Sequence, residues 1–98
     1  MENVELSAVK LEQLAARLKA IAHPTRIAII EMLSDGGRLS VTEIYQQLEI
    51  EQAAASHHLN IMKNKGVLDS RREGKKIFYC LQNEALSEII RCVNKCKD

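Results

Sequence analysis

The sequence predicts a single, mainly α-helical domain that carries one small β-hairpin near its C-terminal end. The 98 residues leave room for one compact domain. Apolar residues recur at the spacing of helix turns along most of the chain, and this spacing changes to alternation only around residues 67–81. The expected order is therefore four helices, two strands and a final helix, in one domain over residues 1–98.

The first two helices are expected on either side of a proline. Leu11, Leu14 and Leu18 recur at helical spacing and predict an amphipathic helix over residues 5–21. Pro24 cannot continue that helix, but it suits the first turn of the next one, which we expect to end near residue 33. The Ser-Asp-Gly-Gly sequence that follows is typical of a turn.

Two short helices joined by about four residues come next. Ser40 and Glu43 have the spacing of a capping box, which predicts the start of the third helix. The fourth helix is expected from Gln52 to about Lys65, with Gly66 ending it. After Gly66 the helical spacing of apolar residues ends and an alternating pattern begins.

The hairpin and the last helix complete the predicted fold. Strands are expected over residues 67–72 and 75–81, joined by a two-residue turn at Glu73-Gly74, where glycine supplies a positive φ. Residues 38–39 are a candidate for one additional strand pair. Helical spacing returns from Asn83 onward.

Composition excludes several classes of protein. The chain is 46% hydrophobic and 28% charged, which is typical of a folded domain. It has no apolar run long enough to span a membrane, and its first residues lack the features of a secretory signal. Gly-rich phosphate loops, paired carboxylates in an apolar setting and a Ser-His-Asp arrangement are also missing from the pattern, so we do not expect an enzyme.

Positive charge is concentrated in one part of a nearly neutral chain. The net charge is +1, yet residues 52–76 hold six basic and two acidic side chains. A local basic block in a neutral protein indicates either a surface that binds a polyanion or an ordinary solvated charged surface, and the surrounding elements decide between them. Two short helices followed by a basic hairpin are typical of a helix-turn-helix with a wing.

This arrangement favours double-stranded DNA as the partner. A helix fits the major groove when its outward side chains are small or form hydrogen bonds, and hairpin cations can reach phosphates or the minor groove. The residues expected to contact DNA are Gln52, Ala53, Ser56, His57 and Asn60 on the fourth helix, and Arg71, Arg72, Lys75 and Lys76 on the hairpin.

Several segments resemble the ArsR/SmtB-type transcriptional repressors. They are Ile-Ala-His-Pro-Thr-Arg at 21–26, Ala-Ala-Ser-His-His-Leu at 54–59, Gly-Val-Leu at 66–68 and the hairpin at 71–81. The resemblance covers roughly residues 11–98. It implies a homodimer that reads an inverted-repeat operator with its fourth helix and represses transcription until a metal, metalloid or thiol-reactive signal releases it.

The same resemblance implies that the first and last helices form the dimer interface. A chain this short is only marginally stable alone, so an apolar interface is also expected on physical grounds. The residues assigned to it are Leu11, Leu14, Leu18, Leu86, Ile89, Ile90 and Val93.

The chain departs from the family pattern at its usual metal sites. Ser40 and Thr42 stand where many members have two cysteines, and Asn83 and Ala85 stand where others have an aspartate and a histidine. Neither pair supplies the ligands that zinc needs, so no metal is expected at either site. A cysteine that some members carry in the second helix is also missing. Glu51 occupies a position where serine is frequent, and its charge near a phosphate would be repulsive.

The three cysteines leave two interpretations open. Their odd number and their position at 80, 92 and 96 favour free thiols in a reducing cytoplasm. Cys92 and Cys96 are four residues apart on one helix, and with Cys80 or a partner's thiols they could bind As(III) or a soft metal, or form a redox pair. Alternatively they are small apolar residues that pack, with Cys80 filling the core.

Histidines and Arg26 are interpreted as structural, with one exception. We expect His23 to separate two helices, His58 to be half-buried, and His57 to point outward. Arg26 is expected to form a structural ion pair rather than to contact DNA. Two alternatives to the main hypothesis are a winged-helix module that binds protein or RNA, and a DNA-binding protein that has no inducer.

Overall fold

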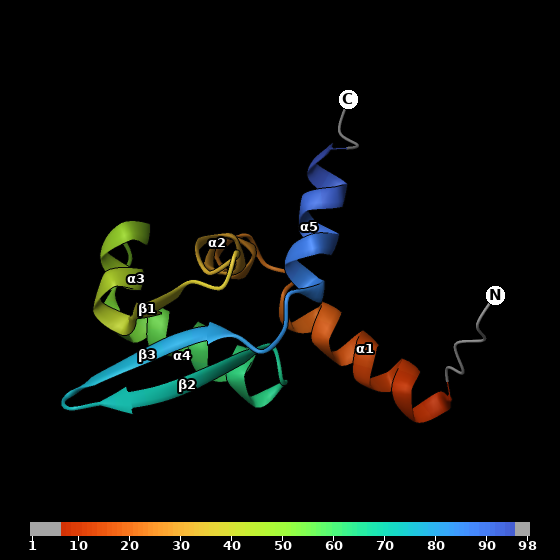
Figure 1. The fold of residues 1–98 in the computed structure, drawn as a ribbon, viewed down its shortest axis with the longest axis horizontal. Coiled ribbons are helices and arrows are strands. Elements are labelled where there is room, and N and C mark those ends of the chain that lie inside the picture. The colour runs from red at the N-terminus through yellow and green to blue at the C-terminus, as the bar shows by residue number, and fades with distance from the viewer. Residues whose placement is uncertain (1–6, 96–98) are drawn as a thin grey trace.

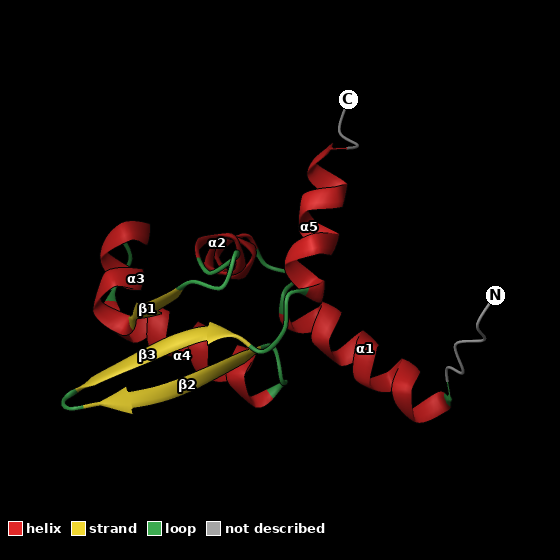
Figure 2. Cartoon of the chain, in the orientation of Figure 1, coloured by secondary structure: helices red, strands yellow, loops and turns green. Residues whose placement is uncertain are grey.

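A computed structural model of the chain describes residues 7–95, which form helices and a small sheet in the predicted order (Figures 1 and 2). The elements are α1 (Ala8–Ala20), α2 (Pro24–Met32), β1 (Arg38–Ser40), α3 (Val41–Leu48), α4 (Gln52–Asn64), β2 (Leu68–Glu73), β3 (Lys76–Leu81) and α5 (Ala85–Lys95). No helix among the described residues is long and apolar enough to cross a membrane.

The sheet has three antiparallel strands in the order β1-β3-β2. β1 is a full three-residue strand that pairs Arg38–Ser40 with β3, one residue longer than the predicted pair. In the hairpin, Glu73 is opposite Lys76, so the two-residue turn consists of Gly74 and Lys75 rather than Glu73 and Gly74. Gly74 has φ +64°, which explains the glycine at that place.

Local hydrogen bonds set where the helices begin. Ser7 caps α1, so this helix starts later than the sequence pattern predicts. His23 caps α2, because its Nδ1 accepts a hydrogen bond from the backbone N–H of Thr25 at 3.1 Å. Pro24 lies in the first turn of this helix, as predicted. The predicted capping box of α3 is confirmed, since both of its reciprocal hydrogen bonds are present.

The core lies between α2, α3, α4 and the sheet. Its fully buried large side chains are Ile29, Ile30, Leu33, Ile44, Leu59, Met62 and Leu68. Because α2 and α4 bury one face each against this cluster, the opposite face of α4 is left on the surface.

The helices α1 and α5 extend away from the sheet, on the side opposite the tip of the hairpin (Figure 1). Five of the apolar residues assigned to a dimer interface are exposed in the protomer: Leu11, Leu14, Leu18, Ile89 and Val93. The other two assigned residues pack mainly within their own protomer. Leu86 is only 8% exposed and belongs to the core of its own protomer, and Ile90 is partly buried against that core, because the first turns of α5 pack on α2.

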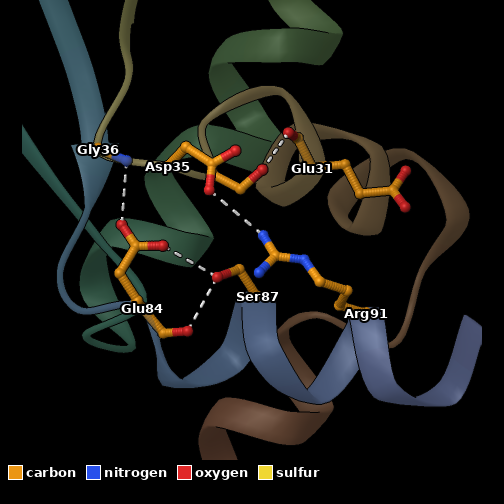
Figure 3. Close-up of polar contacts among 7 residues, drawn as sticks. Glu31, Asp35, Gly36, Glu84, Ser87 and Arg91 are labelled. Carbon is orange, nitrogen blue, oxygen red and sulfur yellow. Dashed lines mark hydrogen bonds and ion pairs between the residues drawn. The ribbon is translucent and has the colours of Figure 1, made fainter. Parts of the chain in front are cut away.

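Polar contacts fix α5 against the turn that follows α2 (Figure 3). Glu84, just before α5, accepts a hydrogen bond from the backbone N–H of Gly36 at 3.2 Å. The hydroxyl of Ser87 donates to the backbone carbonyl of Glu84 at 2.8 Å, and Arg91 lies 3.5 Å from the Asp35 carboxylate. These contacts set the direction in which α5 leaves the domain.

Candidate nucleic-acid interface

A helix-turn-helix is formed by α3 and α4. The connecting residues are 49–51, and Glu49 ends α3 in the left-handed conformation with φ +56°. A hydrogen bond from the backbone N–H of Ile50 to the carbonyl of Tyr45, at 3.2 Å, stabilises this turn. Glu51 precedes α4, and its carboxylate does not cap the helix.

The outward face of α4 contains the predicted groove-reading residues. Ala55, Leu59 and Met62 are 0% exposed and anchor the helix to the core. A helix advances about 100° per residue, so Ala53, His57 and Asn60 lie on the side opposite this buried stripe. Four of the five predicted residues, Gln52, Ala53, His57 and Asn60, are exposed, and Ser56 at the flank is half-buried. The helix therefore presents small and hydrogen-bonding side chains to solvent.

The wing is the β2–β3 hairpin. All four predicted cations, Arg71, Arg72, Lys75 and Lys76, are exposed. Side chains alternate between the faces of a strand, so Arg71 and Arg72 project from opposite faces of β2. Arg72 is partly oriented by the turn, because its Nε donates to the carbonyl of Gly74 at 3.3 Å.

Arg38 is a residue of this region that sequence reasoning missed. Its Nη1 and Nη2 donate to the two carboxylate oxygens of Glu73 at 2.6 and 3.1 Å, and its guanidinium stacks 4.2 Å from the centre of the Phe78 ring. The hydrogen bond from Arg38 lowers the pKa of Glu73 and keeps it ionised. The register pairs Arg38 with Cys80 and Glu73 with Lys76, so the arginine reaches Glu73 only by extending across Phe78 on β3, and a linear pattern gives no signal for the pair.

Arg26 forms structural hydrogen bonds, but its partner differs from the predicted carboxylate. Its Nε donates to Nδ1 of His58 at 3.0 Å, and its Nη1 donates to the carbonyl of Ala20 at 3.1 Å. His58 is half-buried and His57 is exposed, as predicted. The prediction of an ion pair is therefore wrong, because the group that α4 places next to Arg26 is an imidazole.

The structure describes two of the three cysteines, and they lie on different elements. Cys80 is on β3, but it is only partly buried, because it faces away from the side on which Tyr79 joins the core. Its interpretation as a core residue is therefore wrong. Cys92 is exposed on α5, and Cys96 lies outside the described residues. Residues 7–95 contain no group of three His, Cys, Asp or Glu side chains placed to hold a metal ion, and thiol sensing stays a prediction.

Comparisons with known proteins agree with this geometry. The sequence model described as "Bacterial regulatory protein, arsR family" matches residues 23–70. An uncharacterized HTH-type transcriptional regulator of Methanocaldococcus jannaschii is 37% identical over 86 residues, which cover 88% of this chain and 97% of the relative. The region that the family model matches includes the helix-turn-helix and the start of the wing.

Solved structures share the whole architecture. The transcriptional repressor PagR of Bacillus anthracis superposes with a TM-score of 0.79 at 37% identity, covering 89% of this chain and 99% of PagR. A possible ArsR-family regulator of Mycobacterium bovis, described as a homodimeric winged helix-turn-helix DNA-binding domain, has a TM-score of 0.80 at 27% identity, covering 94% and 84% of the two chains. These relatives are transcriptional regulators rather than enzymes, and the chain belongs to the arsR family of winged helix-turn-helix transcriptional regulators.

Proposed function

We propose that this chain is a repressor that binds an inverted-repeat operator as a homodimer, with α4 in the major groove and the hairpin wing against the DNA backbone. The observation that carries this proposal is the joint exposure of all four hairpin cations and of the outward face of α4. The acid closest to the hairpin tip, Glu73, is already paired with Arg38, so it does not cancel their charge.

The exposed apolar stripes support a two-fold dimer. Leu11, Leu14 and Leu18 on α1, together with Ile89 and Val93 on α5, form apolar surface that a second copy would bury. A two-fold axis through such an interface presents one α4 to each half of a palindromic site, with half-sites separated by whole turns of DNA. The symmetry of the operator follows from the symmetry of the dimer.

The test is fluorescence anisotropy with a labelled duplex taken from upstream of this protein's own gene. We expect tight binding whose logarithm falls linearly with the logarithm of salt concentration, because neutralised phosphates release counterions. A scrambled duplex and an RNA hairpin of equal length serve as competitors. The absence of duplex binding even at low salt would overturn the proposal, and preferential binding of the RNA would favour an RNA-binding module.

Repression is tested separately from DNA binding. Relatives differ in the direction of their effect: PagR of Bacillus anthracis is named a repressor, and HlyU of Vibrio cholerae is named an activator. We expect addition of the protein to purified polymerase and a template that carries its operator to lower the amount of transcript. An increase in transcript would assign it the role of an activator.

Release by a thiol-reactive signal is a further part of the proposal. It is supported by the exposure of Cys92 on α5, close to the apolar residues assigned to the dimer interface. We expect As(III), a soft metal or a mild oxidant to weaken DNA binding of the reduced protein, and Cys92→Ser to remove this response. Cys80→Ser tests whether the thiol on β3 also takes part in the response. If the wild-type protein does not respond to any of these reagents, the cysteines have only a packing role.

A further inference from the structure

Two sequence motifs that are not needed for the DNA contacts proposed above lie against each other. His23 is the N-cap of α2, Arg26 lies in the first turn of α2, and His57-His58 is in the middle of α4. Arg26 donates from Nε to Nδ1 of His58 at 3.0 Å and from Nη1 to the carbonyl of Ala20 at 3.1 Å. The ring of His23 is centred 4.7 Å from that of His58. Arg26 therefore joins the end of α1, the start of α2 and the middle of α4.

This geometry requires a neutral His58. An arginine only donates hydrogen bonds, so Nδ1 of His58 must be the unprotonated nitrogen of the ring. A proton on Nδ1 removes the acceptor and places an imidazolium beside a guanidinium that is always charged. The hydrogen bond that joins α2 to α4 is then replaced by a repulsion.

The surroundings of His58 favour the neutral form. Burial is the largest effect that lowers its pKa from the ordinary 6.5, and the charges of Arg26, His23 and His57 lower it further. These three groups come from α2, its N-cap and α4, and each is a cation or becomes one on protonation. Glu12 and Lys19 of α1 and Lys65, the C-cap of α4, line the same pocket as Arg26. In the described residues, no carboxylate forms an ion pair with this cluster.

We propose that the Arg26–His58 hydrogen bond is a pH-sensitive positioning contact that holds α4 in its DNA-binding orientation, so that acidification weakens operator binding. The inference rests on the proposed function. His58 directly follows the exposed His57 and lies two residues from both Ser56 and Asn60, so a shift of α4 at His58 displaces the groove-reading residues. His58 itself is a positioning residue, because its half-buried ring accepts a hydrogen bond from Arg26.

The direction in which DNA affinity changes on acidification distinguishes the loss of this hydrogen bond from a general electrostatic response. Acidification makes a protein more cationic, and this tightens binding to a polyanion. Protonation of His58 acts in the opposite direction because it breaks an internal hydrogen bond. Weaker binding at low pH is therefore the specific signature of His58.

The test measures operator affinity by anisotropy between about pH 8 and about pH 5.5 at constant ionic strength. The key variant is His58→Asn, whose amide oxygen can accept from Arg26 and does not titrate. His57→Asn changes a predicted DNA contact, so it is compared only with its own affinity at high pH. We expect wild-type affinity to fall roughly three- to tenfold on acidification, the size expected when one hydrogen bond is broken. We expect His58→Asn to match wild type at high pH and not to show this fall, whereas His57→Asn keeps it.

A second measurement does not depend on how a variant folds. Long-range ¹⁵N–¹H spectra of the wild-type imidazoles report which ring nitrogen carries the proton. We expect His58 to show an unprotonated Nδ1 at high pH, and its titration midpoint to coincide with that of DNA binding. A His58→Asn variant that keeps the wild-type pH profile, or a protonated Nδ1 at high pH, would overturn the inference. Failure of the wild-type protein to bind DNA at any pH would instead overturn the proposed function.

Discussion

Arg38 and Glu73 are 35 residues apart in the chain, yet they form a two-point ion pair that joins the strand before the helix-turn-helix to the end of β2. The pair fastens the hairpin wing to β1, and β1 leads directly into α3. The pair adds to the backbone pairing of β1 with β3, which joins the wing to the segment that leads into the helix-turn-helix. The same ion pair neutralises a carboxylate close to the cationic tip.

We expect Arg38→Ala to weaken DNA binding several-fold on any sequence, because Glu73 then carries an unpaired negative charge next to the phosphates. Glu73→Gln should have the opposite effect, because it frees Arg38. Arg91→Ala is the control, since it breaks an ion pair on the α5 side of the domain whose arginine is equally exposed. Salt titrations by anisotropy measure these effects. Equal affinities for wild type and Arg38→Ala would show that the pair does not influence DNA binding.

The hairpin cations should set affinity rather than sequence preference. We expect Arg72→Ala or Lys76→Ala to weaken binding to specific and scrambled duplexes alike, and to reduce the salt slope by about 1 for each phosphate that is no longer neutralised. Lys10→Ala removes an exposed lysine of α1 and serves as the control. Unchanged binding by both hairpin variants would remove the wing from the proposed interface.

The capping box of α3 should make a measurable contribution to stability. The backbone N–H of Glu43 donates to the Ser40 hydroxyl at 3.1 Å, and the Glu43 carboxylate accepts from the backbone N–H of Ser40 at 2.8 Å. We expect Ser40→Ala to lower the free energy of unfolding by about 1 kcal/mol, which is typical when an N-cap side chain is removed. Thr42→Ala, in the same turn, is the control. Equal denaturant midpoints for the two variants would contradict this prediction.

Acid should weaken the same cap. The hydrogen bond from the Ser40 backbone lowers the pKa of Glu43 below its ordinary 4.5. A carboxyl whose pKa is lower in the folded state stabilises the fold above its unfolded pKa, and this contribution disappears as the pH falls through the folded value. Thermal melts over the acidic range should therefore show a smaller difference between wild type and Glu43→Gln at low pH than at neutral pH.

Local signals in the sequence were sufficient for most of the fold. Two helix starts were marked by local signals, namely the Ser40–Glu43 spacing and Pro24. The C-terminal end of α4 was marked by Gly66, which adopts a positive φ of +80°. The outward residues of α4 follow from the position of its buried stripe. These features depend on neighbours a few residues apart, so they can be read along the chain.

Contacts between distant segments could not be predicted in this way. The partner of Arg26 was expected to be a carboxylate, because a linear sequence does not show that α4 places an imidazole there. Leu86 and Ile89 have the same apolar character on one helix, yet the protomer buries the former and leaves the latter 42% exposed. Periodicity shows that a helix has an apolar face, but not how that face is divided between the core and a partner.

This division determines which substitution can separate the dimer. Ile90 packs partly on its own protomer, so a charge at that position would disturb the fold as well as the interface. Leu18 is 39% exposed and Ile89 is 42% exposed, so Leu18→Glu or Ile89→Glu should place a charge in the interface and leave the protomer folded.

Sedimentation velocity is expected to show a dimer for the wild-type protein and a monomer for Leu18→Glu. The operator affinity of Leu18→Glu should be at least about tenfold lower than that of wild type, because one protomer engages only one half-site. Val9→Glu is the control: Val9 is 62% exposed and lies about half a turn around α1 from Leu18. If Leu18→Glu and Ile89→Glu both remain dimers with folded circular dichroism spectra, the two-fold axis does not pass through α1 and α5, and the half-site spacing derived from it must be revised.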